Sequence, residues 1–171
     1  FAQGYLQDNR LVGVEGIPRD ANERGMLAAE MLARMAEEGL AEARALFDPV
    51  VVPVSAMQDQ VVGCTDFMGM LGDLAPGARA NCGLSNVSNG APEELRPILN
   101  ATYLAMLVHH GIDAAIVNAF ESITVDIGRA RRPDLTCLVE RSMAGEQVPQ
   151  EGLSEEAAAF VKTARVLLGQ S

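Results

Sequence analysis

Residues 79–86 read Arg-Ala-Asn-Cys-Gly-Leu-Ser-Asn, a short apolar run that ends in a polar turn with Asn89-Gly90 just behind it. A run of this kind, bounded by turn residues, is typical of a strand buried on both faces of a parallel sheet. Parallel α/β proteins carry their ligand-binding and catalytic groups at the carboxyl ends of the strands. The pattern therefore predicts that the amide of Asn86 lies where a ligand would bind.

The same alternation of short apolar runs and amphipathic stretches continues in both directions. It predicts strands at 11–15, 45–52, 79–86 and 114–118. It predicts helices at 21–38, 59–74, 93–110 and 154–168. A further helix is predicted to start at 121 and to break near 132–133, and residues 142–152 are predicted to form a loop. Four strands alternating with helices indicate parallel βα units. Such units form either a small open sheet or half of an eight-stranded βα barrel, which needs about 250 residues.

The composition narrows the class of protein. A length of 171 residues with 49% hydrophobic and 21% charged residues predicts one globular domain. The net charge of -10 disfavours nucleic acid as a partner, because phosphate binding needs clustered cations. We expect no membrane helix and no export signal, since there is neither a long apolar run nor a basic-then-apolar leader. The three cysteines are Cys64, Cys82 and Cys137, and they form no Cys-x-x-Cys pair. Their scattered positions predict a cytoplasmic location and no metal site.

Polar residues recur where the predicted strands end. Asp48 lies inside an apolar run, and an unpaired buried carboxylate is costly, so it should pair with an arginine or face a ligand rich in N–H donors. A strand-end aspartate bonded to its local backbone is the alternative. Gln58 follows the same strand, and Asn118 ends the last one. Asn86, Asn89 and Asn118 are each explained individually as turn formers, but together with Asp48 they predict one shared rim.

The sequence lacks the residues of a nucleophilic enzyme. Its two histidines, His109 and His110, are adjacent near a predicted helix end, so no Ser-His-Asp or Cys-His arrangement is indicated. Neither a Gly-x-Gly-x-x-Gly fingerprint nor a phosphate-binding Gly-x-x-x-x-Gly-Lys loop occurs. Lys162 lies on the last predicted helix, away from the strand ends. The predicted rim therefore suits a neutral heterocycle held by hydrogen bonds.

Several segments resemble those of the pterin-binding methyltransferases. The resemblance rests first on Gly-Leu-Ser-Asn-Val-Ser at 83–88, and then on 96–100, 102–106, 111–116, 16–18, 48–49 and 58–59. This family comprises the methyltetrahydrofolate:corrinoid/iron–sulfur protein methyltransferases and the folate domain of cobalamin-dependent methionine synthase. The similarity covers most of residues 11–120 and again 160–169.

The resemblance implies a fold and a set of site residues. The family fold is a (β/α)₈ TIM barrel, and residues 1–171 would form its C-terminal half, strands five to eight, with an insertion at 121–153. Asp48 would hold the pterin through its N–H groups, and Asn86 would reach the methylated nitrogen. The other pterin-binding positions implied are Ser85, Asn89, Asn118 and Gln58. The first half of the barrel would supply a further aspartate and asparagine.

The resemblance also implies a reaction and partners. The enzyme would move a methyl group between methyltetrahydrofolate, its substrate, and the cobalt of a corrinoid (cobalamin). Because no Asp-x-His-x-x-Gly motif for corrinoid binding occurs, the corrinoid would arrive on a partner protein, with or without an iron–sulfur cluster. The full-length protein would be a homodimer. Two alternatives remain open: a dihydropteroate synthase-like pterin enzyme, and a non-catalytic pterin-binding half-barrel that needs a partner chain.

Overall fold

The computed structural model describes residues 4–7, 10–13 and 18–170. The strands are β1 (Gly4–Gln7), β2 (Arg10–Gly13), β3 (Leu46–Phe47), β4 (Arg79–Gly83) and β5 (Ala114–Ile116). The helices are α1 (Ala21–Glu37), α2 (Val54–Leu74), α3 (Arg96–His109), α4 (Ser122–Gly128), α5 (Pro133–Met143) and α6 (Glu155–Leu167). Three 3₁₀ turns complete the set: η1 (Glu42–Arg44), η2 (Leu84–Ser88) and η3 (Glu93–Leu95).

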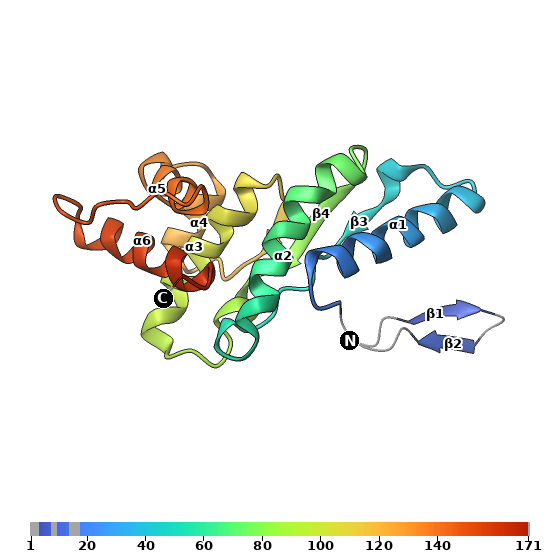
Figure 1. The fold of residues 1–171 in the computed structure, drawn as a ribbon, viewed down its shortest axis with the longest axis horizontal. Helices are drawn as coiled ribbons and strands as arrows, with labels where there is room; N and C mark the ends of the chain where they lie inside the picture. Colours follow the sequence, from blue (N-terminus) through green and yellow to red (C-terminus); the bar gives the residue numbers. More distant parts are fainter. Residues whose placement is uncertain (1–3, 8–9, 14–17, 171) are drawn as a thin grey trace.

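A parallel sheet of three strands, in the order β3-β4-β5, organises the molecule. Phe47 pairs with Ala80, and Cys82 pairs with Ala115. Helix α2 connects β3 to β4, and α3 connects β4 to β5, as in successive βα units. The predicted α/β class with parallel strands is confirmed for this part of the chain. In Figure 1, α2 lies alongside β4, with α1 towards one end of the molecule and α5 and α6 at the other.

The first predicted strand is different from the others. Residues 11–13 belong to β2, which pairs antiparallel with β1 in a separate two-stranded sheet, and residues 14–15 lie outside the described part. The prediction of a fourth parallel strand there is therefore wrong. In this small sheet Gln7 pairs with Arg10, and Gly4 pairs with Gly13.

Helices α1 and α2 form where the apolar spacing predicted helices, and a glycine lets them meet. Asp20 caps α1 by accepting a hydrogen bond from the backbone N–H of Glu23 at 2.9 Å. Helix α2 begins at Val54, five residues before the prediction, and is kinked at Met57. A Cβ at Gly63 would lie 3.1 Å from the Cα of Asp20, so the glycine inside α2 allows the start of α1 to approach closely.

The C-terminal helices are part of the same hydrophobic core as the sheet. The cluster of buried apolar residues includes Phe47 of β3, Val61 of α2, Leu135 of α5 and Phe160 of α6. Helix α5 extends to Met143, so the predicted loop begins later than residue 142. The segment 121–153 thus packs into the core through α4 and α5.

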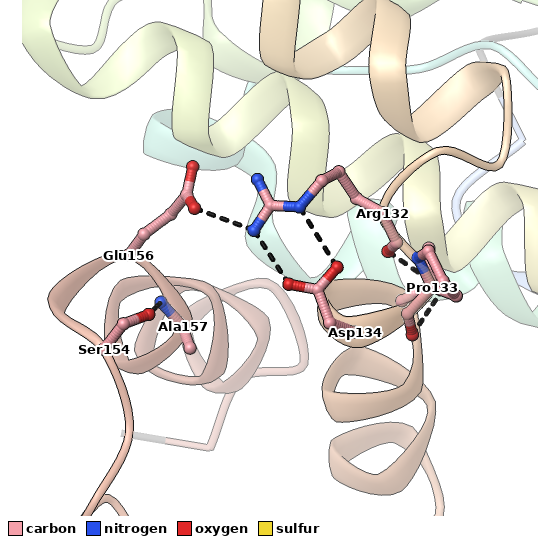
Figure 2. Close-up of polar contacts among 7 residues, drawn as sticks. Arg132, Pro133, Asp134, Ser154, Glu156 and Ala157 are labelled. Carbon is pink, nitrogen blue, oxygen red and sulfur yellow. Dashed lines mark hydrogen bonds and ion pairs between the residues drawn. The ribbon is translucent and has the colours of Figure 1, made fainter.

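An ion-pair bridge holds the starts of α5 and α6 together. The guanidinium of Arg132 donates to Asp134 Oδ2 and to Glu156 Oε2, both at 2.8 Å, as Figure 2 shows. Ser154 caps α6 by accepting from the N–H of Ala157 at 3.2 Å, which confirms the predicted helix start. The hydrogen bonds from Arg132 lower the pKa of Asp134. This bridge adds polar contacts to the apolar packing of the two helices.

One face of the parallel sheet is covered and the other is open. Ala80 and Cys82 are buried, and their side chains point to the helix-covered side. Residues that alternate with them point the other way, where Leu46 is 56% exposed and Ile116 is 70% exposed. Because parallel sheets are ordinarily covered on both faces, the open face of this sheet is its most unusual feature.

Candidate functional site

Polar side chains follow all three parallel strands at the same edge of the sheet. Asp48 comes directly after β3, Ser85 and Asn86 lie in η2 directly after β4, and Asn118 comes two residues after β5. Because the strands are parallel neighbours, their carboxyl ends share one edge. We call these four residues the rim. The predicted convergence of Asp48, Asn86 and Asn118 on one side of the sheet agrees with this topology.

Asp48 is exposed, not buried, so the expectation of a buried carboxylate is wrong. Strand β3 ends at Phe47, and Asp48 Oδ1 accepts a hydrogen bond from the N–H of Val50 at 2.8 Å. The chain turns here, with Val50 at φ 61° and a proline on either side of the turn, which cannot continue the ladder. No arginine pairs with Asp48 among the described residues. Its Oδ2 is left for a ligand.

The amide of Asn86 lies on the open face of the sheet. A Cβ at Gly83 would point to that face, and it would meet Asn86 Nδ2 at 3.4 Å. The backbone carbonyl of Asn86 accepts from the N–H of Asn89 at 3.1 Å, which closes the turn. In the part of the chain that the structure describes, the side chain of Asn86 is exposed and makes no hydrogen bond of its own. Both its donors are therefore free for a ligand.

The loop that carries Asn86 is held by its backbone and neighbouring side chains. Ser55 donates its hydroxyl proton to the carbonyl of Asn89 at 3.0 Å, and Ser88 donates to the carbonyl of Ser85 at 3.2 Å. Arg96 in turn donates to the hydroxyl of Ser88 at 3.4 Å. These contacts fix the path of the chain while the side chain of Ser85 stays exposed. Asn89 contributes through its backbone.

A carboxylate at the end of β5, missed in the sequence, organises the third part of the rim. Glu121 accepts hydrogen bonds from Asn118 Nδ2 at 3.3 Å, from Asn100 Nδ2 at 3.1 Å and from the hydroxyl of Thr124 at 3.1 Å. Asn118 Oδ1 also accepts from the N–H of Phe120 at 3.1 Å. Both ends of the Asn118 amide thus make a hydrogen bond to a nearby residue. The signal for this cluster was the spacing of Asn118 and Glu121, three residues apart across a helix start.

Gln58 is attached to the last helix. Its Nε2 donates to the carbonyls of Val166 and Leu167, at 3.3 and 3.2 Å, where α6 ends. Gly169 has φ 71°, and a Cβ there would lie 2.8 Å from Gln58 Nε2. The Nε2 group of Gln58 therefore caps the C-terminus of α6 with both of its hydrogen bonds. The neighbouring Asp59 lies within α2.

Replacing Gln58 with alanine is expected to lower the stability of the protein. Loss of both hydrogen bonds leaves two helix-end carbonyls without this partner, which costs about 1 kcal/mol in the free energy of unfolding. Urea denaturation measures the cost. Asp59→Ala, one residue along and exposed, is the control and should change stability by less than about 0.5 kcal/mol. An unchanged free energy of unfolding in Gln58→Ala would show that its side chain does not stabilise the end of α6.

The buried thiols near the sheet are poor nucleophiles. Burial raises the pKa of Cys64 to about 11 and that of Cys82 to about 12. Both stay protonated near neutral pH, and a thiol attacks only as its thiolate. The nearby hydroxyl of Tyr103 donates to the carbonyl of Val61 at 3.2 Å, and burial raises its pKa as well. None of these groups reaches the rim in a reactive form.

A cavity of about 490 Å³ lies at the opposite end of α3 from the rim. His109 and His110 line it, and His109 Nδ1 lies 3.5 Å from Glu140 Oε1. Burial lowers the pKa of His110. Among the described residues, no group of three His, Cys, Asp or Glu side chains is arranged to hold a metal ion. This cavity is therefore separate from the rim.

The rim combines a carboxylate oxygen, a free amide and an exposed hydroxyl on a rigid base. Such groups bind a polar heterocycle and can strengthen a hydrogen bond as charge develops on it. No model of a known protein family matches the sequence. No helix within the described ranges is long and apolar enough to cross a membrane.

Proposed function

We propose that the protein transfers a methyl group between methyltetrahydrofolate and the cobalt of a corrinoid carried by a partner protein. The observation that carries the proposal is the amide of Asn86, which is exposed, lies over Gly83 and has no hydrogen bond among the described residues. Asp48 lies at the end of the adjacent strand with one carboxylate oxygen open. The resemblance of residues 83–88 to the pterin-binding methyltransferases supports the same ligand.

Asn86 has a defined role in this reaction. The bond between the pterin nitrogen and the methyl carbon breaks, and its electron pair stays on the nitrogen. The new bond to carbon takes its pair from cobalt(I), and the nitrogen later gains a proton from solvent. A tertiary amine is a poor leaving group, because charge builds up on its nitrogen. A neutral N–H donor from Asn86 strengthens its bond as that charge develops, which lowers the barrier.

Asp48 fits the recognition of the pterin ring. The open Oδ2, together with the second lone pair of Oδ1, can accept two hydrogen bonds side by side, which matches the amino group and ring N–H of a pterin. Its Oδ1 is held in place by the N–H of Val50, so the side chain is oriented before the ligand arrives. The exposed hydroxyl of Ser85 is next to Asn86 and can complete the contacts.

The open sheet face supports a site whose other wall lies elsewhere. Leu46 and Ile116 are large apolar residues on that face, at the two edge strands. In a complete βα barrel these positions point into the packed interior. We propose that residues 18–128 form part of such a barrel and that further βα units cover the open face. The rim then forms the mouth, which must stay shallow so that a corrinoid can approach.

A non-catalytic pterin-binding half-barrel is the second candidate. The exposed apolar residues of the open face favour it, because they indicate a surface that another polypeptide covers. In that case Asn86 would contribute to affinity but not to a rate. Binding and transfer therefore have to be measured separately.

The test is a titration followed by a transfer assay. We expect methyltetrahydrofolate to bind, as measured by calorimetry, and to methylate cobalt(I) cobalamin, as followed by the absorbance of the corrinoid. Binding without transfer would select the half-barrel. Condensation of a pterin pyrophosphate with 4-aminobenzoate would select a dihydropteroate synthase, and absence of pterin binding would refute all three.

A further inference from the structure

Asn81 occupies the centre of the middle strand of the sheet. It is the third residue of β4, between Ala80 and Cys82, whose side chains are buried under the helices. By alternation, the side chain of Asn81 points to the open face. Its partner across the ladder is Ala114 of β5. On the other side, the ladder with β3 ends at the pair Phe47–Ala80, and Asp48 directly follows that pair in the chain.

The environment of Asn81 leaves its amide available. Within the described ranges, its side chain is half-buried and makes no hydrogen bond. Its neighbours on this face are small, with Ala114 beside it and Gly83 two residues along the strand. Asparagine is disfavoured inside strands, so the residue adds nothing to the sheet that an apolar side chain would not provide better. An amide in this position is explained by a partner outside the sheet.

The positions of the three side chains suggest one ligand that spans them. Asn86 Nδ2 lies over Gly83, and Asn81 lies two residues further into the strand, a distance of about 6.6 Å along its axis. This distance is comparable to the width of a two-ring heterocycle. A ring system that enters edge-on from the rim would place one end near Asn86 and the other end at Asn81, with Asp48 at its side.

We infer that Asn81 binds the aminopyrimidine edge of the pterin, the exocyclic amino group and the ring nitrogen beside it, at the end remote from the methylated nitrogen. The inference rests on the proposed function, because it assumes a pterin at the rim. A primary amide offers an acceptor and a donor side by side, which is the complement of an amino group next to a ring nitrogen. Asn81 is then a binding residue that sets the depth and orientation of the ring, while Asn86 faces the reacting nitrogen.

Asn81→Ala is expected to weaken methyltetrahydrofolate about tenfold, the effect of losing an ordinary hydrogen-bonded pair. An analogue that lacks the exocyclic amino group should bind to Asn81→Ala and to the wild-type protein with the same, reduced affinity. This comparison is a double-mutant cycle between a side chain and a ligand group. Asn22→Ala, an exposed asparagine at the start of α1, is the matched control and should change neither affinity.

Two further measurements keep the inference testable if Asn81→Ala is poorly folded. The side-chain NH₂ signal of Asn81 in the wild-type protein should shift in an NMR titration with methyltetrahydrofolate. Asn81→Asp, of the same size, should lose at least as much affinity, because it removes the donor and places a charge near Asp48. Unchanged affinity of a folded Asn81→Ala variant for methyltetrahydrofolate, or an NMR signal of Asn81 that does not shift on binding, would refute the role of Asn81. Either result would leave the proposed function intact. A wild-type protein that binds no pterin would refute the proposed function.

Discussion

Replacement of Asn86 by alanine is expected to slow methyl transfer by roughly two to three powers of ten, while methyltetrahydrofolate still binds. The side chain is exposed, lies over Gly83 and makes no hydrogen bond in the described part of the chain. Its loss should therefore leave the fold intact, so the change in rate reports on the reaction itself. Single-turnover transfer to cobalt(I) cobalamin measures the rate, and calorimetry measures the affinity.

The matched variant is Asn86→Asp, which keeps the size of the side chain and removes the N–H donor. We expect it to be as slow as Asn86→Ala, because the donor carries the effect and not the volume. The loss should appear in kcat far more than in the dissociation constant, as for an interaction that strengthens in the transition state. Asn86 is not the donor to the methylated nitrogen if Asn86→Ala transfers the methyl group as fast as the wild-type protein. The same conclusion follows if kcat and the binding affinity are reduced by the same factor.

The helices could be predicted because their signals are local. Residues 21–38 were predicted from apolar spacing, and residues 154–168 from a capping serine at the helix start. The structure has α1 and α6 there, with Asp20 and Ser154 as their caps. The central strand was predicted too, although its end was placed three residues late. Residues 84–88 form a 3₁₀ turn, which apolar content alone does not distinguish from a strand.

The errors arise where non-local contacts decide. The apolar run at 45–52 predicted a long buried strand, but β3 ends at Phe47 and the chain turns with Asp48 exposed. The run at 11–15 has the composition of a parallel strand, yet its described part pairs with β1 in a hairpin. In both cases an apolar run specifies burial or extension but does not specify the partner strand.

The sequence predicted which residues follow the strands, but it did not predict the contacts that their side chains make. Strand ends can be located in the sequence, so Asp48, Asn86 and Asn118 were found. The direction of the Asn81 side chain depends on the bounds of β4 and on its register with β5, and neither follows from the sequence alone. The capping of α6 by Gln58 joins residues more than a hundred positions apart, and no local pattern contains it. Glu121 was read only as a helix start, although its carboxylate organises Asn118.

Replacement of Phe160 by alanine is expected to lower the free energy of unfolding by about 3–5 kcal/mol. Phe160 is fully buried at 0% exposure, and it belongs to the apolar face of α6 that also buries Ala157, Val161, Ala164 and Leu167. The same cluster contains Phe47 of the sheet and Leu135 of α5. A cavity at Phe160 therefore removes contacts from the core shared by the whole described fold.

This loss is a large fraction of the stability of a domain, about 5–15 kcal/mol, and urea denaturation measures it. Val166→Ala is the matched control, because it shortens an apolar side chain on the same helix that is 43% exposed, and it should change stability by less than about 0.5 kcal/mol. A single transition with an unchanged denaturant slope is expected for Phe160→Ala, since one core joins the sheet to α5 and α6. Two separate unfolding transitions, of which only one is destabilised by the substitution, would mean that α5 and α6 fold independently of the sheet. The segment 121–153 would then be a separable addition, whereas the packing of Leu135 and Phe160 against the shared core argues that it is not.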